Sequence, residues 1–139
     1  MNIKEYIKEQ RLITDGAMGT YYEEKYSEDT VIAEKENLKN PEQIKEIHLE
    51  YLRAGARLIR TNTFAANTMF LADMQEVKET VRAGYEIAKE AVTAFQTENG
   101  KEIPVFIGAD LGPIYDLDHQ DYDNVLPVSY THLTLPTIA

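Results

Sequence analysis

Asp15-Gly16-Ala17-Met18-Gly19-Thr20 and Thr61-Asn62-Thr63-Phe64 are the two stretches of sequence that decide the fold. Each follows an apolar run that predicts a β-strand, and each stands just before a loop. A segment long enough for a crossover helix separates them. Two polar strand ends joined in this way are typical of one wall of an active site in a parallel α/β protein.

The rest of the pattern alternates strands with helices. Helices are predicted over residues 3–10, 41–55 and 73–98, strands over 12–13, 57–63 and 103–109, and an irregular loop with room for one helical turn over 21–39. Asn40 with Gln43, and Asp73 with Glu76, have the spacing of capping boxes. Gly55 is predicted to end the first long helix as its C′ residue.

This order indicates right-handed βαβ units in an α/β fold. The apolar run Val105-Phe106-Ile107 is typical of a strand buried on both faces, as in a parallel sheet. A complete (β/α)₈ barrel needs roughly 250 residues, so the 139-residue chain is predicted to supply the first three βα units of an incomplete TIM barrel. A small open sheet is the structural alternative.

Composition excludes several classes of function. With 24 acidic and 14 basic residues the net charge is −10, which argues against non-specific binding to nucleic acid or to an anionic membrane. The chain has no cysteine, so it offers no disulfide, thiolate metal ligand or cysteine nucleophile. Residues 1–10 do not form a signal peptide, and no apolar run approaches the ~20 residues of a membrane span. We expect a cytoplasmic location.

The first strand end has the chemistry to bind a charged group. Gly16 and Gly19 permit a sharp turn that exposes successive backbone N–H groups, which can cradle a carboxylate or a phosphate. Asp15 is placed to bind a cationic group such as an ammonium. The same residues also fit a tight turn in which Asp15 bonds to its own loop, and the spacing does not decide between the two. No nucleotide-binding motif is present.

The other two strand ends add polar groups. Thr61, Asn62 and Thr63 can orient a small polar ligand, although such a segment alone more often caps its strand. Asp110, at the end of the third strand, either faces the same pocket or holds the turn before Pro113. Because neighbouring parallel strands bring their carboxyl ends to one face, we expect the three segments to meet where barrel active sites lie.

Other polar residues are predicted to be structural. His48 lies on the apolar face of its helix and is read as a packed histidine rather than a base. No two histidines have metal-ligand spacing. Arg57 and Arg60 flank Leu58-Ile59, and an arginine inside a barrel strand is expected to pair with an acidic residue on a neighbouring strand.

The C-terminal part changes in style. Residues 116–123 are acidic but fail the calcium-loop pattern, because Asp121 stands where glycine is needed and Pro127 where glutamate is needed. We predict a solvated loop there. Residues 128–139 resemble a translated sequencing adapter. Our hypothesis is that residues 1–127 are native sequence and 128–139 are a non-native or disordered tail, an artefact of cloning or assembly.

Four motifs in order resemble the N-terminal part of the homocysteine S-methyltransferase family over about residues 9–126. The motifs are Asp15 to Thr20, Pro41 to Gly55, Thr61 to Asn67 and Ile107 to Pro113. This family includes the homocysteine-binding module of cobalamin-dependent methionine synthase. It also includes bacterial proteins that fuse this module to a methylenetetrahydrofolate reductase, which the third-strand motif resembles most.

The resemblance implies a barrel that binds homocysteine at the carboxyl ends of its strands. By analogy, Asp15 would help hold the amino group, and the backbone around Gly16, Ala17 and Met18, with a threonine of Thr61-Asn62-Thr63, would hold the carboxylate. The family binds zinc through three cysteines on later strands, and the zinc-bound thiolate accepts a methyl group to give methionine. The donor stays open, with methyl-folate and methyl-cobalamin as candidates, and FAD is expected if a reductase domain follows in the parent protein.

The absence of cysteine is a departure from the family. We therefore expect a fragment that keeps part of the amino-acid pocket, has no catalytic residue or zinc ligand, and is inactive alone. Its partner would be homocysteine, its oligomeric state is left open, and its unpaired sheet edge favours aggregation. Two other readings remain: a fragment of a phosphate-binding barrel enzyme, and a non-catalytic acidic α/β binding module.

Overall fold

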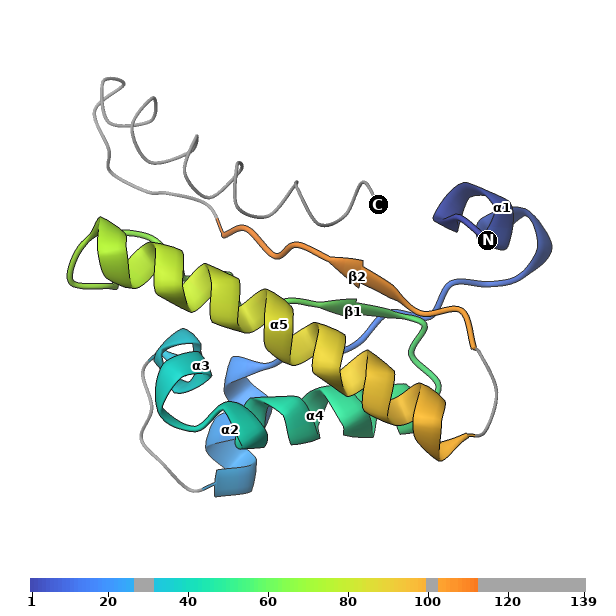
Figure 1. The fold of residues 1–139 in the computed structure, drawn as a ribbon, viewed down its shortest axis with the longest axis horizontal. Helices are drawn as coiled ribbons and strands as arrows, with labels where there is room; N and C mark the ends of the chain where they lie inside the picture. Colours follow the sequence, from blue (N-terminus) through green and yellow to red (C-terminus); the bar gives the residue numbers. More distant parts are fainter. Residues whose placement is uncertain (27–31, 100–102, 113–139) are drawn as a thin grey trace.

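The structure, a computed structural model, describes residues 1–26, 32–99 and 103–112 (Figure 1). Its sheet has two parallel strands, β1 (Leu58–Arg60) and β2 (Phe106–Gly108), with Ile59 opposite Ile107. Thr14 forms an isolated parallel bridge to Leu58. The mixed α/β class is as predicted. The acidic stretch 116–123 and the tail 128–139 lie outside the described residues, so both remain predictions.

Two long helices pack against each other and against β1. These are α4 (Pro41–Arg53) and α5 (Met74–Glu98), close to the predicted ranges (Figure 1). The core between them combines residues from α4, β1 and α5 with Ala56 of the intervening turn: Leu52, Ala56, Ile59, Ala88 and Phe95. None of the helices in the described part of the chain combines the length and the apolar composition of a membrane span. Helix α4 is the crossover that was predicted between the two strand ends.

The ends of the long helices follow the predicted chemistry in part. Gly55 has a φ of 113°, and its N–H donates to the carbonyl of Leu52, so it is the left-handed C′ residue that was predicted. At the start of α5, Asp73 Oδ1 accepts from the Glu76 N–H at 2.9 Å. The reciprocal half of that capping box is wrong, because Glu76 Oε2 accepts from the N–H of Ala72 instead.

The predicted capping box at the start of α4 is wrong. Asn40 makes no side-chain bond to the helix backbone. Its Nδ2 donates instead to Glu36 Oε2 at 2.6 Å, and Gln43 Oε1 accepts from the Tyr22 hydroxyl. Both side chains are drawn into contacts with segments that precede α4. Local spacing carries no information about these partners.

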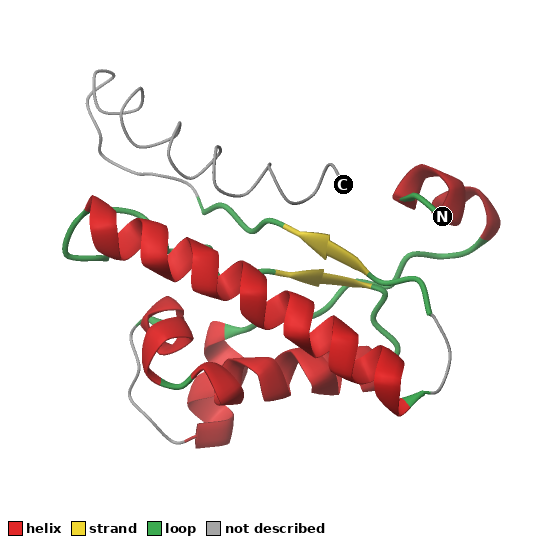
Figure 2. Ribbon diagram, viewed as in Figure 1, coloured by secondary structure: helices red, strands yellow, loops and turns green. Residues whose placement is uncertain are grey.

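The irregular loop predicted over residues 21–39 is also wrong. Three short helical elements lie in or beside it (Figure 2): α2 (Gly19–Tyr26), η1 (Ala33–Lys35) and α3 (Glu36–Lys39). Tyr22 is fully buried and shares a cluster with Ala33 and the α4 residues Ile44 and Ile47. These elements are too short to form alone, so tertiary packing stabilises them without an apolar repeat that a sequence would show.

The sheet is smaller and less covered than predicted. Residues 12–13 are not a strand, and pairing on that side is reduced to the bridge at Thr14. Phe106 and Ile107 are only half-buried, so the expectation of a strand buried on both faces is wrong for β2. The short helix α1 (Ile3–Glu9), which was predicted, covers part of β2 because the ring of Tyr6 meets that of Phe106 edge-on at 5.4 Å.

A close approach between α5 and the end of β1 depends on Gly84. A Cβ at this position would lie 2.9 Å from both Asn37 Nδ2 and Thr63 Cγ2, and 3.2 Å from the carbonyl oxygen of Asn62. The Asn37 amide meanwhile donates to the carbonyls of Asn62 and Thr80 at 2.7 and 3.1 Å. The absence of a side chain at Gly84 therefore lets α3, α5 and the strand end share one hydrogen-bonded contact.

We expect Gly84→Ala to destabilise the chain by about 1–3 kcal/mol, because the added methyl group displaces Asn37 or Thr63 and outweighs the gain in helix propensity. Urea unfolding followed by circular dichroism would measure this. Gly19→Ala is the matched control, since a Cβ there meets nothing within 4 Å. Equal or greater stability of the Gly84 variant would contradict the packing described here.

His48 is a packed histidine, as predicted. It is fully buried on α4, and neither ring nitrogen has a hydrogen-bond partner among the described residues. Burial lowers its pKa from 6.5 to about 4, against a smaller opposing effect of the Asp15 charge. The folded protein therefore binds this proton less readily than the unfolded chain does.

The depressed pKa makes folding acid-sensitive. His48 contributes fully to stability above its unfolded pKa of 6.5, and this contribution falls as the pH drops towards about 4. We expect a loss of about 2 kcal/mol between pH 7.5 and pH 5 from this group alone. The measurement is urea unfolding at both pH values, with His48→Leu as the comparison. A variant whose pH dependence equals that of the wild type would disprove this source of acid sensitivity.

Candidate functional site

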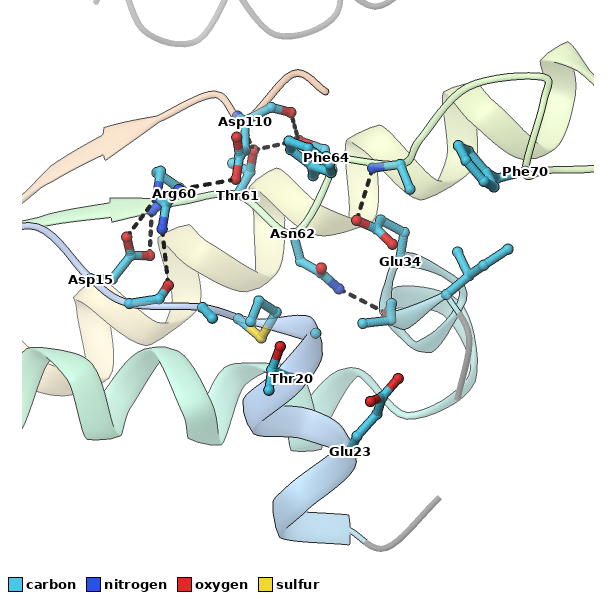
Figure 3. Close-up of a pocket in the computed structure, with 18 residues that line it drawn as sticks. Asp15, Thr20, Glu23, Glu34, Arg60, Thr61, Asn62, Phe64, Phe70 and Asp110 are labelled. Atoms are coloured by element: carbon cyan, nitrogen blue, oxygen red, sulfur yellow. Dashed lines mark hydrogen bonds and ion pairs between the residues drawn. The ribbon is translucent and has the colours of Figure 1, made fainter. Parts of the chain in front are cut away.

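A pocket of about 490 Å³ opens at the carboxyl ends of β1 and β2 (Figure 3). Its wall also includes the loop that follows Thr14 and residues from η1. The pocket is lined by every residue that the sequence singled out as substrate-binding: Asp15, Gly16, Ala17, Met18, Thr61, Asn62, Thr63 and Asp110. The expectation that the three strand ends meet on one face is confirmed.

Arg60 links the three strand ends. Its Nε donates to Asp15 Oδ1 at 2.8 Å, and its Nη2 donates to the carbonyl of Gly16 at 3.0 Å. Its Nη1 lies 3.5 Å from Asp110 Oδ2. The predicted pairing of a strand arginine with an acidic neighbour is therefore confirmed for Arg60. Arg57 instead donates to backbone carbonyls and lies over the ring of Phe95.

The loop after Asp15 is held from below by Tyr51. The Tyr51 hydroxyl donates to the carbonyl of Ala17 at 2.7 Å. A Cβ on Gly16 would lie 2.8 Å from the hydroxyl oxygen of Tyr51. The carbonyl of Met18 accepts from the backbone N–H of Tyr22 in α2 at 2.8 Å. Among the described residues, no acceptor is found for the backbone N–H groups of residues 16–18, so these groups are free to meet an anion.

Thr61 and Thr63 connect the end of β1 to that of β2. Their hydroxyls lie 2.7 Å apart, and Thr63 Oγ1 donates to the carbonyl of Asp110 at 2.8 Å. The N–H of Asp110 donates to Thr61 Oγ1 at 3.3 Å. Both threonines are buried. These side chains therefore cap their strand, while lining the pocket at the same time.

The side chain of Asn62 turns the other way, towards the helices. Its Nδ2 donates to the carbonyl of Ala33 at 2.9 Å and to Asn37 Oδ1 at 2.8 Å. Nearby, Glu34 Oε1 accepts from the N–H of Ala65 at 2.9 Å, and Glu34 lines the pocket. Sequence reasoning missed Glu34, because it lies in the segment read as an irregular loop and has no motif of its own.

The pocket is acidic. Asp15, Glu23, Glu34 and Asp110 line it, with Arg60 as the basic residue among the lining side chains. Burial raises the pKa of Asp110; Arg60 opposes this shift, and the charge of Asp15 adds to it. Arg60 has its own pKa raised, chiefly by its hydrogen bond to Asp15. This charge balance favours a ligand that carries a positive group.

No group of three or more metal-binding side chains is found within residues 1–26, 32–99 and 103–112. The sequence contributes no cysteine. The described residues therefore do not fit a zinc site of thiolate ligands.

Similar proteins share both sequence and architecture with this chain. A homocysteine S-methyltransferase from Escherichia coli (strain K12) is 31% identical over 123 residues, covering 83% of this chain and 40% of that protein. A methionine synthase from Mycobacterium leprae (strain TN) is 27% identical over 148 residues, covering 96% of this chain and 12% of that protein. The chain thus spans less than half the length of these relatives.

Solved structures share the fold of this chain. The oxidised form of the E. coli homocysteine methyltransferase MmuM matches with a TM-score of 0.82 at 24% identity, covering 94% of this chain and 52% of that one. Its apo form matches with a TM-score of 0.72 at 28% identity, covering 91% and 46%. The shared fold extends over nearly all of this chain and about half of each structure.

A family model described as homocysteine S-methyltransferase matches residues 12–135. This range includes all the strand-end segments that form the pocket. It also passes residue 127, where we predicted native sequence to end, and that boundary stays a prediction. Since the match covers most of the sequence, the chain belongs to the homocysteine S-methyltransferase family.

Proposed function

We propose that this chain forms the amino-acid-binding wall of a homocysteine S-methyltransferase, which transfers a methyl group to the thiol of homocysteine to form methionine. The observation that carries the proposal is the convergence of the three strand-end segments on one pocket in a chain of this family. We further propose that the α/β unit corresponds to the first three βα units of a (β/α)₈ barrel. The likeness to MmuM over nearly the whole chain supports this.

The pocket suits the two ends of an amino acid. The carboxylates of Asp15 and Asp110 provide a wall for the ammonium group, and the free N–H groups of residues 16–18 provide donors for the carboxylate. The hydrogen bond from the Tyr51 hydroxyl to the carbonyl of Ala17 helps to position these donors. In this arrangement the α-ammonium and α-carboxylate groups of the amino acid are bound by this chain. Its thiol is then available to other residues of the parent protein.

Methyl-transfer chemistry is not assigned to the described residues. They do not fit a zinc site, so a bound zinc ion would require residues outside the described ones. FAD is expected if a reductase domain follows in the parent protein. Methyl-folate and methyl-cobalamin stay the candidate donors. Homocysteine as the small-molecule partner is also part of the proposal, and the family supports it. A cytoplasmic location is proposed with it. The net charge of −10 disfavours nucleic acid and anionic membrane as partners.

Phosphate is a poorer ligand for this pocket than an amino acid. Four carboxylates line it, and the guanidinium of Arg60 is already paired with Asp15. A phosphate group would meet net negative charge, whereas a zwitterion can place its ammonium against the carboxylates. The pocket's charge therefore favours the amino-acid proposal over the phosphate-binding alternative.

Gly16→Ala is expected to weaken homocysteine binding about tenfold, because the methyl group would clash with the Tyr51 hydroxyl and displace the loop donors, equivalent to about one charge-assisted hydrogen bond. Ligand-observed NMR titration would give the dissociation constants. Gly19→Ala, at the start of α2 directly after this loop and with open space around it, should bind as the wild type does. Unchanged affinity in the Gly16 variant would argue against the loop as the carboxylate site.

The 139-residue chain is expected to form no methionine from homocysteine and a methyl donor. It contains no cysteine, and its described residues include no cluster that could hold a metal ion. Mass spectrometry of reaction mixtures containing zinc, with the E. coli homocysteine S-methyltransferase as the positive control, would test this. Zinc-dependent formation of methionine by the purified chain would refute the expectation.

A further inference from the structure

We propose that the ring of Phe64 is the surface against which the side chain of the bound amino acid lies, and that Gly112 is the positioning residue for this ring. The inference rests on the proposed function and deepens it. The strand ends supply partners for the ammonium and carboxylate groups, and this inference assigns a contact to the side chain. It follows from an exposed ring that is held in place at the pocket (Figure 3).

Phe64 presents an aromatic ring to a pocket that is otherwise polar at its strand ends. It lines the pocket together with Asp15, Thr61 and Asp110, and it is 53% exposed. A ring of this size that stays in contact with water is stabilised when a ligand covers it, because apolar surface then leaves water. The pocket therefore combines polar partners with an uncovered apolar surface, as small-molecule sites do.

The backbone around Phe64 is fixed by hydrogen bonds on both sides. The N–H of Ala66 donates to the carbonyl of Thr63 at 3.1 Å, which places Phe64 at the corner of a tight turn. The N–H of Ala65 donates to Oε1 of the buried Glu34 at 2.9 Å. The ring is thus attached to a segment that is bonded to η1 and does not depend on a ligand for its position.

Gly112 supports the ring from the segment that follows β2. Its N–H donates to the carbonyl of Phe64 at 3.0 Å. A Cβ on Gly112 would lie 3.1 Å from both Cδ1 and Cε1 of the ring, and 2.5 Å from the carbonyl oxygen of Phe64. Phe64 lines the pocket and Gly112 does not, which is the arrangement expected of a ring with backbone behind it and open space in front. The absence of a side chain at Gly112 therefore lets the ring lie where it does.

The chemistry of an amino acid gives this ring a use. The ammonium and carboxylate groups are matched by Asp15 and by the N–H groups of residues 16–18. Methylene groups form no hydrogen bonds, so the side chain gains free energy only against an apolar surface, and a thioether or thiol sulfur also packs favourably against an aromatic ring. The larger apolar residues of the pocket wall are Met18, Ile32, Phe64 and Phe70. Phe64 is the one that directly follows the polar strand end of β1.

The test compares homocysteine with glycine, which has the same ammonium and carboxylate groups but no side chain. Ligand-observed NMR titration of the 139-residue chain gives both affinities, and the preference for homocysteine measures the contribution of the side chain. We expect Phe64→Ala to lower this preference about fivefold by weakening homocysteine, while the affinity for glycine changes less than about twofold. Leu111→Ala is the matched control, because Leu111 is also an exposed apolar residue but does not line the pocket.

Gly112→Ala tests the positioning role. The added methyl group would displace the ring, so the preference for homocysteine should fall in the wild-type background. It should change little further in the Phe64→Ala background, because the glycine acts through the ring. Circular dichroism confirms that each variant is folded. A purely structural role for Gly112 would instead weaken homocysteine and glycine equally.

Four outcomes would overturn the inference. In the first, Phe64→Ala keeps the wild-type preference for homocysteine. In the second, it weakens both ligands equally, which assigns the ring to the geometry of the loop. In the third, Leu111→Ala or Phe70→Ala lowers the preference as much as Phe64→Ala does. In the fourth, the wild type binds both ligands with equal affinity. Failure of the wild type to bind either ligand would overturn the proposed function as well, so the two failures are distinguishable.

Discussion

The buried segment Thr61–Thr63 is the constraint on which the rest of the structure depends. Its side chains alternate in direction as they leave β1. The two threonines bond to each other and to the backbone of Asp110, whereas Asn62 bonds to Ala33 and Asn37 on the helical side. One short segment therefore ties the sheet to the helices, and the pocket forms where those ties meet.

These ties explain why the helices approach so closely at this end of the fold. The Asn37 amide reaches the carbonyls of Asn62 and Thr80, and Gly84 leaves room for it. Buried amides of this kind stabilise one arrangement when all their partners are present and are costly when a partner is lost. The geometry of the pocket is thus coupled to the packing of α3 and α5, although neither helix carries the strand-end residues.

The sequence predicted the parts that depend on local chemistry. The long helices, the turn at Gly55 and the meeting of polar strand ends follow from periodicity, backbone freedom and the parallel arrangement of strands. It failed where partners distant in the chain decide the outcome. Asn40 and Gln43 have capping spacing but bond to Glu36 and Tyr22, and the side chain of Glu34 bonds to the N–H of Ala65, which is distant in the chain. An ion pair between Arg60 and an acidic residue of a neighbouring strand was predicted, and Asp15 is that residue. The second contact of Arg60, with Asp110 at the end of the other strand, was not predicted.

The alternation of Thr61, Asn62 and Thr63 also limits how this protein can change over evolutionary time. Deletion or insertion of one residue within β1 would exchange the two sides of the segment, placing asparagine against the sheet and threonine against the helices. Every tie described here would lose its partner at once. A change in the length of β1 should therefore destabilise the protein more than a single substitution within β1, which removes the contacts of one residue. Length variation among descendants of this sequence should therefore fall outside the segment that runs from β1 to Thr63.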